Sequence, residues 1–226
     1  MTSPQNPREL LSGSRTMKQN VLPNLLIEIV EFLKQQNLHL SQQSRDGRIN
    51  SAFNEDEIFN LLDSHFAINR PNMRDWVDFS FYENNVFYPV NIKVSTTKTT
   101  DNLNCKLGIY YALTGKIPPF GNGVSWETYF KTLKENLTTN DKDYYFLVIN
   151  KDNPSDVFAT SLKCLESILP NGNNLPFQAK WDNNRQVIQR DFVEVKDFLL
   201  GTFEQSLKLR ADAYLHFRKY FYESQY

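Results

Sequence analysis

The sequence predicts an α/β protein with helices and strands interleaved along one domain, and three observations support this class. Apolar residues recur at helical spacing in several segments, including 22–36. They alternate with polar residues between 76 and 95, as in half-buried strands. Residues 143–150 form an almost continuous apolar run, which is typical of a strand buried on both faces. Hydrophobic residues make up 40% of the 226 positions, which is enough for a large core.

The N-terminal part of the chain predicts a polar arm and two helices. Residues 1–19 are polar and lack periodicity, so we expect an arm followed by a single domain over 20–226. The first helix is predicted at 22–36, where Pro23 suits the first turn. A loop then leads to a second helix, for which Asn54 is the expected N-cap. Acidic residues fill its first turn, where the helix dipole favours negative charge: Glu55, Asp56 and Glu57.

A β-hairpin is predicted next. "WVDFSFY" (76–82) and "VFYPVNIKVS" (86–95) both alternate, and the Asn pair at 84 and 85 between them is a turn signal. The apolar face of the first strand is expected to comprise Val77, Phe79 and Phe81. The polar face of the hairpin would then hold Asp78, Asn91 and Lys93 together. Pro89 predicts an interrupted ladder, at a sheet edge or a bulge.

The second half of the chain predicts further elements of both kinds. "LGIYYALTG" (107–115) indicates a short helix that Gly115 closes. The buried strand at 143–150 is followed by a short partner strand at 157–160 and by a helix at "SLKCLESIL" (161–169). Residues 170–185 are expected to be a long polar loop that carries Trp181. The segment from 191 onward has a rich apolar stripe, which predicts helices over about 192–222.

Composition limits the function. The formal net charge is −1 and the pI is about 6.3, so nucleic-acid binding would need a local concentration of Lys and Arg, or a dimer. Cys105 and Cys164 make neither a disulfide framework nor a zinc site. There is no secretory signal and no apolar run near the ~20 residues that span a bilayer. Nor is there a phosphate-binding G-x-x-x-x-G-K-[ST] loop. We expect a cytoplasmic protein that does not associate with a membrane and does not use a nucleotide cofactor.

The spacing from Asp78 to Asn91 and Lys93 fits metal-dependent phosphodiester cleavage. Such chemistry needs a divalent cation, an attacking water and a positive group that stabilises charge on phosphorus. Mg²⁺ takes oxygen ligands and keeps several waters, so one carboxylate and one carbonyl suffice from the protein. A lysine on a strand is by itself ordinary, and Asp75 could be the metal-binding acid in place of Asp78. The alternation around Asp78 favours Asp78.

"DFSF" and "PVNIKVSTT" together resemble the PD-(D/E)XK motif of nucleases, specifically the type II restriction endonucleases that carry Asn in place of the second acid. "GRINSAFNEDEI" and "DNLNCKLGIYYALTG" are also similar to that group, so the resemblance covers 46–115. It implies an α/β/α core around a mixed β-sheet, at about 46–165, in a prokaryotic intracellular enzyme. It also implies Mg²⁺ dependence and cleavage of double-stranded DNA that leaves 5′-phosphate ends.

The resemblance also implies roles for individual residues. Asp78 would be the metal-binding acid, Ile92 would offer its backbone carbonyl to the metal, and Lys93 would be the catalytic lysine. Asn91 stands where the family usually has an acid, and it would belong to the catalytic set as a neutral oxygen ligand of the metal, which favours one strongly held metal ion over two. Glu55 matches an acid that supports such sites from the preceding helix, although it could equally be a first-turn carboxylate.

Two segments rich in Asn and Lys are predicted to read DNA, at about 97–106 and 171–186. The candidate contacts are Lys98, Thr99, Asn102, Asn104, Lys106, Asn173, Asn174, Lys180 and Arg185. Arg70 and Arg74 are further candidates for phosphate contacts, which position a protein without specifying sequence. Ser95, Thr96 and Thr97 either contact phosphate or simply complete a strand.

Cutting both strands at a palindromic site calls for two active sites related by a twofold axis, hence a homodimer. The helices at 22–36 and 196–222 could supply the interface, or they could belong to the core. Two other functions remain open. The chain could be a non-catalytic, sequence-specific DNA-binding protein on a nuclease scaffold, with Asn91 marking the lost acid. It could also be a nuclease of repair or recombination.

Overall fold

The computed structural model describes residues 22–36, 38, 47–72 and 75–222, with the backbone alone for 47–53. The predicted arm at 1–19 and Arg74 lie outside the described residues. The helices and strands follow in the order α1 (Asn24–Gln35), α2 (Gly47–Asp63), β1 (Phe79–Glu83), β2 (Val86–Ser95), β3 (Thr100–Leu103), α3 (Lys106–Thr114), α4 (Trp126–Asn136), β4 (Tyr145–Asn150), β5 (Val157–Ser161), β6 (Leu169–Pro170), β7 (Phe177–Lys180) and α5 (Phe192–Phe221). Short 3₁₀ turns, η1 and η2, occupy Leu162–Cys164 and Trp181–Asn184.

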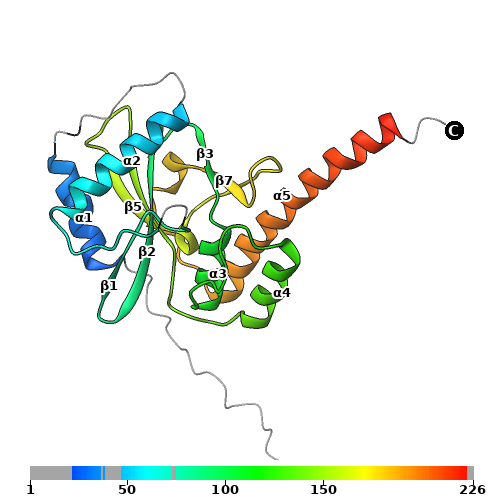
Figure 1. The fold of residues 1–226 in the computed structure, drawn as a ribbon, viewed down its shortest axis with the longest axis horizontal. Coiled ribbons are helices and arrows are strands. Elements are labelled where there is room, and N and C mark those ends of the chain that lie inside the picture. Colours follow the sequence, from blue (N-terminus) through cyan, green and yellow to red (C-terminus); the bar gives the residue numbers. More distant parts are fainter. Residues whose placement is uncertain (1–21, 37, 39–46, 73–74, 223–226) are drawn as a thin grey trace, which may run out of the picture.

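A four-stranded mixed sheet with the order β1-β2-β4-β5 forms the centre of the fold. β2 pairs antiparallel with β1 and parallel with β4, and β5 pairs antiparallel with β4. Helices α1 and α2 lie on one side of this sheet, and α3 and α4 lie on the other (Figure 1). The predicted α/β class, with a mixed sheet flanked by helices, is therefore confirmed.

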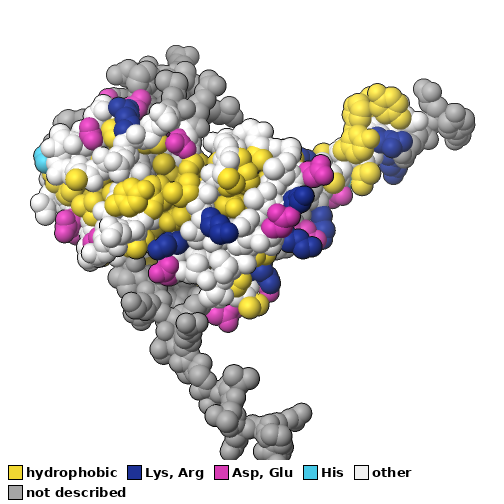
Figure 2. All heavy atoms as spheres, turned by 60° about the horizontal axis from the view of Figure 1, so that its bottom comes forward, with side chains coloured by type: hydrophobic (Ala, Val, Ile, Leu, Met, Phe, Trp, Pro, Cys, Tyr) yellow, Lys and Arg dark blue, Asp and Glu magenta, His cyan; other side chains and the backbone are white. Residues whose placement is uncertain are grey.

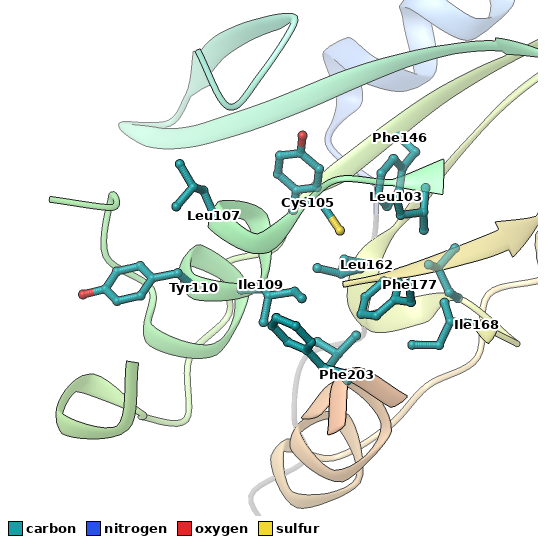
Figure 3. Packing of buried hydrophobic residues seen from close by; sticks show 14 of the residues in the cluster. Leu103, Cys105, Leu107, Ile109, Tyr110, Phe146, Leu162, Ile168, Phe177 and Phe203 are labelled. Carbon is teal, nitrogen blue, oxygen red and sulfur yellow. The ribbon is translucent and has the colours of Figure 1, made fainter. Parts of the chain in front are cut away.

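Strand β4 separates two hydrophobic cores, as its continuous apolar run predicts. Tyr145, Leu147 and Ile149 pack with α1, α2 and β2 in one cluster. Phe146 and Val148 point the other way and belong to a cluster with α3 and α5. Figure 3 shows this second cluster, in which Phe203 of α5 packs beside Ile109 and Phe177.

A second, three-stranded sheet with the order β3-β7-β6 stands beside the main one. Parts of both segments that the sequence predicted as loops belong to it, because 97–106 includes β3 and 170–185 includes β7. Trp181 was expected on a polar loop, but its side chain is fully buried, and its indole N–H donates to Asp101 Oδ2 at 3.0 Å. Buried cross-strand packing thus outweighs the polar composition of this segment.

Several predicted boundaries are wrong. Helix α2 begins at Gly47, so Asn54 is a buried interior residue and no N-cap. Strand β1 begins at Phe79, and Val77 packs in the opposite core from Phe79 and Phe81. "SLKCLESIL" forms η1 and the start of β6 where a helix was expected. The β1–β2 register runs through Pro89 without a break, because pairing with β4 begins only at Val90.

Helix α5 is one continuous helix of 30 residues, where the sequence predicted helices in the plural. Asp191 and Glu194 form a capping box at its start. Its buried residues, Val195, Leu199, Phe203 and Ser206, all lie in the first half. The second half extends away from the rest of the molecule (Figure 1). Across the part of the chain that the structure describes, α5 included, no helix is both long and apolar enough to cross a membrane.

Candidate active site

A pocket of about 210 Å³ opens between the end of the β1–β2 hairpin and β3. Its polar lining comes from Asp75, Asp78, Asn91, Lys93, Asn104 and Asn122, and its apolar lining includes Trp76, Leu103 and Phe146. The structure therefore brings together the predicted Asp78, Asn91 and Lys93, and it adds Asp75, the alternative acid. Asn104, predicted as a DNA contact, is part of the same wall.

Asp78 lies one residue before β1 and continues its ladder. Its backbone N–H donates to the carbonyl of Val90 at 2.9 Å. Because β1 starts only at Phe79, the next free position on β2 is Ile92, and its N–H donates to Asp78 Oδ2 at 2.6 Å. The Asn91 amide nitrogen donates to the same oxygen at 2.6 Å. Two donors from β2 thus fix the orientation of this carboxylate.

The backbone of Ile92 faces the same way as the Asp78 side chain. A strand residue directs its N–H and its C=O to the same neighbour. Since the Ile92 N–H points toward Asp78, its carbonyl oxygen is directed to that side of β2, beyond the end of β1. This is the direction required by the predicted role of Ile92 as a carbonyl ligand.

Lys93 projects on the same side of β2 as Asn91, because side chains two residues apart share a face. Its ammonium lies 3.5 Å from the backbone carbonyl of Asn102 on β3, which links the two sheets. Asn91 and Lys93 share one face of β2, as predicted, because Val90, Ile92 and Val94 are buried in the core on the other face.

Burial raises the pKa of Asp78 above its usual value. The Ile92 N–H, the Lys93 charge and the Asn91 amide each act to lower it, but they do not offset desolvation. The carboxylate of Asp56 on α2 adds to the rise. The protein alone therefore stabilises this carboxylate incompletely, and a nearby cation would stabilise it further.

Asp75 and Asp78 both border the pocket, but their contacts differ. Asp75 is exposed, and its Oδ1 accepts the backbone N–H of Trp76 at 2.8 Å. Asp78 contacts both Asn91 and Ile92. The preference for Asp78 as the acid of this constellation agrees with that difference.

Glu55 is on α2, as expected, but it does not belong to the pocket lining. The α2 residue whose charge acts on Asp78 is its neighbour Asp56, which also forms an ion pair with Arg70 at 2.7 Å. The role of Glu55 stays a prediction. The sequence offered the same signal for both residues, since they are adjacent in one acidic helix turn.

Sequence reasoning missed Tyr144 and Cys105, which also line the pocket. The Tyr144 hydroxyl donates to the Trp76 carbonyl at 2.8 Å and so holds the loop before β1. Burial raises the pKa of the Cys105 thiol to about 12, which keeps it neutral. Tyr144 sits in the apolar run 143–150, where composition indicates core, and Cys105 sits between Asn104 and Lys106, where a lone cysteine gives no sign of a site.

The other predicted DNA contacts scatter over the surface around the second sheet. Thr99 Oγ1 lies 2.6 Å from Thr96 Oγ1, and the Lys106 ammonium lies over the Trp126 ring. Arg185 forms ion pairs with Asp156 at 2.7 Å and Asp182 at 2.9 Å, so its guanidinium already has internal partners. The remaining candidates are exposed or half-buried: Lys98, Asn102, Asn173, Asn174 and Lys180.

The donor atoms suit a hard cation. Within 22–36, 38, 47–72 and 75–222, no group of three or more His, Cys, Asp or Glu side chains could hold a metal ion. The pocket instead is lined by Asp78 and Asn91, which carry a carboxylate and an amide oxygen, and the backbone of Ile92 faces the same side of β2. Mg²⁺ accepts such a set when water and substrate oxygens complete its octahedron.

Comparison with known proteins returned no match of this chain to any family model and none to any curated protein.

Proposed function

We propose that this protein is a Mg²⁺-dependent, type II site-specific deoxyribonuclease, which cleaves both strands of duplex DNA at a palindromic site and leaves 5′-phosphate ends. The observation that carries the proposal is the constellation of Asp78, Asn91, Ile92 and Lys93. Asp78, Asn91 and Lys93 line one pocket, and Asp78 is held by two hydrogen bonds of 2.6 Å, from the Asn91 amide and from the Ile92 backbone N–H. This is the arrangement of acid, carbonyl and lysine that the PD-(D/E)XK resemblance implies.

Each residue has a distinct task in this mechanism. Asp78 and the Ile92 carbonyl would hold the cation, and Asn91 would orient Asp78 through its amide N–H. Lys93 would stabilise the charge that develops on the phosphate oxygens and orient the attacking water. The bound Mg²⁺ would polarise the phosphate and make the bound water more acidic. The half-buried setting strengthens all of these electrostatic interactions.

One observation favours the alternative function, a sequence-specific DNA-binding protein that does not cut. Asn91 uses its amide as a donor to Asp78, so it acts on that carboxylate as a neutral partner. A second acid at this position would add negative charge to hold the cation. A protein that binds DNA without cleaving it does not need that negative charge, so it could carry the neutral Asn91.

The test is cleavage of long phage DNA by the purified protein, with Mg²⁺ and with EDTA. We expect discrete fragments in Mg²⁺ alone. Asp78→Ala and Lys93→Ala should each reduce the cleavage rate by about 10²–10³-fold or more, because each removes a group that stabilises charge in the transition state. Sequencing the fragment ends would give the site and the stagger.

Asp75→Ala is the matched control, since Asp75 borders the same pocket but lacks the contacts with Asn91 and Ile92. It should retain cleavage within a few-fold. Loss of activity in Asp75→Ala together with retention in Asp78→Ala would assign the metal to Asp75. DNA left uncut by the wild type with Mg²⁺, Mn²⁺ and Ca²⁺ would favour the binding function.

The proposed partner in cleavage is a second copy of this chain, joined through the projecting half of α5. Leu209, Tyr214, Phe217 and Phe221 are 49–66% exposed there. With 3.6 residues per turn, Tyr214, Phe217 and Phe221 continue the helix face that buries Leu199 and Phe203 in the core, and Leu209 lies to the side of that face. Covering these side chains on two copies would bury on the order of 1,000 Å², near the lower end for a specific interface. Figure 2 shows hydrophobic side chains gathered at the far end of this helix.

A further inference from the structure

The second sheet has one buried and one open face. Asn102 pairs with Gln178 and Thr100 pairs with Lys180 across β3 and β7. Leu103, Phe177 and Ala179 are fully buried, so they form the inner face. Because side chains alternate along a strand, Asn102, Gln178, Thr100 and Lys180 share the outer face. We call these four residues the β3–β7 outer face.

The two amides of this face are held by a third. The Asn171 amide nitrogen donates to Asn102 Oδ1 at 2.8 Å and to Gln178 Oε1 at 3.3 Å. The Asn171 oxygen accepts the backbone N–H groups of Asn173 and Asn174, both at 3.0 Å. The oxygens of Asn102 and Gln178 therefore turn toward Asn171. Their NH₂ groups, with two donors each, turn away from it.

The turn that carries Asn171 is itself anchored to α5. Arg210 donates to the carbonyls of Gly172 and Asn173, each at 2.8 Å. A Cβ on Gly172 would lie 2.9 Å from the Leu209 Cβ, so the turn and the helix are in close contact. The Asn171 backbone N–H also donates to Ser206 Oγ at 2.9 Å. The amide donors thus stand on a rigid support, which lowers the entropy lost on binding.

The β3–β7 outer face also adjoins the catalytic pocket. The Lys93 ammonium lies 3.5 Å from the carbonyl of Asn102, and the next two residues along the chain, Leu103 and Asn104, line the pocket. In Figure 1, β3 and β7 lie between the main sheet and α5. A duplex whose phosphate enters the pocket would therefore lie close to β3, the strand that carries Asn102.

We propose that the β3–β7 outer face enters the major groove of duplex DNA, where Asn102 and Gln178 donate amide hydrogens to base-edge acceptors. The acceptors of that class are purine N7, guanine O6 and thymine O4. A two-stranded ribbon fits the width of the major groove, whereas the minor groove is narrower and its pattern of groups is degenerate. Lys180 contacts a backbone phosphate. This inference rests on the proposed function, whose DNA substrate it specifies.

The experiment is a selection from a random duplex pool by gel shift in Ca²⁺, which takes the same oxygen ligands as Mg²⁺. The wild type should enrich one motif. Asn102→Asp and Gln178→Glu keep an oxygen for Asn171 but remove the NH₂ donors. Each should lose about tenfold or more of the preference at a particular base pair, since a good base contact discriminates by about 1–3 kcal/mol. Asn102→Ala and Gln178→Ala serve as uncharged second variants.

Lys180→Ala is the matched control on the same face. It should weaken binding to all duplexes and keep the motif, because phosphate contacts do not read sequence. In a duplex with 7-deazapurine at the affected position, a fall in wild-type affinity would identify purine N7 as the acceptor, and Gln178→Ala should then cause no further loss there. Far-ultraviolet circular dichroism and thermal unfolding would confirm that each variant is folded.

Two results would overturn the inference: a wild type that enriches no motif, or amide variants that enrich the wild-type motif unchanged. The selection does not depend on cleavage, so the two proposals fail separately. If the selected motif depends on Gln178 but DNA is not cleaved in Mg²⁺, the proposed nuclease function is refuted and base readout by the β3–β7 outer face is supported. If DNA is cleaved at a site that the amide variants leave unaltered, the nuclease function is supported and base readout by the β3–β7 outer face is refuted.

Discussion

At the scale of single residues, Asp78 completes a strand with its side chain. Its backbone N–H donates to the Val90 carbonyl. Its carboxylate then accepts the Ile92 N–H, which would have bonded to the β1 backbone if β1 extended further. Asp78 Oδ2 receives two donors, so this position requires an oxygen that accepts hydrogen bonds and carries no hydrogen itself. It also places a half-buried negative charge beside the pocket, where burial raises its pKa.

Asp78→Asn should therefore stabilise the fold in the absence of metal. The folded-state pKa of Asp78 is raised, so ionisation opposes folding above that pKa and does not do so below the unfolded value near 3.8. In EDTA at neutral pH the variant should have a higher Tm than the wild type, because the Asn oxygen can still accept the Ile92 N–H. The advantage should disappear as the pH falls below 3.8.

Calorimetry of both proteins between pH 3 and 8 would check this, with Asp75→Asn as the control. The exposed Asp75 should give little change in Tm at any pH. A lower Tm for Asp78→Asn at neutral pH would mean that the two hydrogen bonds outweigh desolvation. Mg²⁺ should raise the Tm of the wild type but not that of the variant, since a ligand that binds only the folded state stabilises it.

At the scale of elements, α3 supports the pocket through a close approach to β4. Gly108 lies against the ring of Tyr144, and an added Cβ would be 2.6 Å from the ring carbon Cγ. Tyr144 in turn lines the pocket and holds the Trp76 carbonyl. The absence of a side chain at Gly108 thus leaves room for the ring of Tyr144, which immediately precedes β4.

Gly108→Ala and Gly201→Ala should change stability in opposite directions. Both glycines are in helices, and alanine is favoured there by about 0.8–1 kcal/mol. At Gly201 an added Cβ meets nothing within 4 Å, so the variant should be more stable. At Gly108 the clash with Tyr144 should dominate and destabilise the protein by about 1–3 kcal/mol. Urea unfolding would measure both, and a stabilised Gly108→Ala would show that the ring moves freely.

At the scale of the whole molecule, the shape separates a compact body from a projecting helix. The first half of α5 packs in the core through Leu199 and Phe203, and the second half carries exposed aromatic residues. The net charge of −1 gives no general attraction to DNA. A homodimer would bring two modest recognition surfaces to one duplex.

Phe217→Glu should convert the proposed dimer into a monomer. Phe217 is 49% exposed, so the change should leave the free energy of unfolding of the body nearly unaltered. A charge at the centre of an apolar interface should weaken association by about 2 kcal/mol or more, which is at least about thirtyfold in Kd. Sedimentation velocity across concentrations would measure this. Lys208→Glu, on the opposite side of the helix, should not alter the mass, and a wild type that sediments only as a monomer on DNA would exclude the dimer.

The sequence by itself determined the fold class, the hairpin around Asn84 and Asn85, the doubly buried β4 and the shared face of Asn91 and Lys93. These follow from local periodicity and turn chemistry, which depend on residues close together in the chain. It also indicated both segments of the proposed reading surface, from their Asn and Lys content.

Only the tertiary structure decided what those segments form. Asn102 and Gln178 are paired across two strands, and Trp181 is buried against Asp101, because contacts between residues about 80 positions apart override a polar, turn-rich composition. The same holds for Tyr144, which composition assigns to the core, and for Cys105, which lies between polar residues in the sequence; packing brings both to the pocket. Long-range packing has no signature in local sequence, so the site beyond Asp78, Asn91 and Lys93 required the fold.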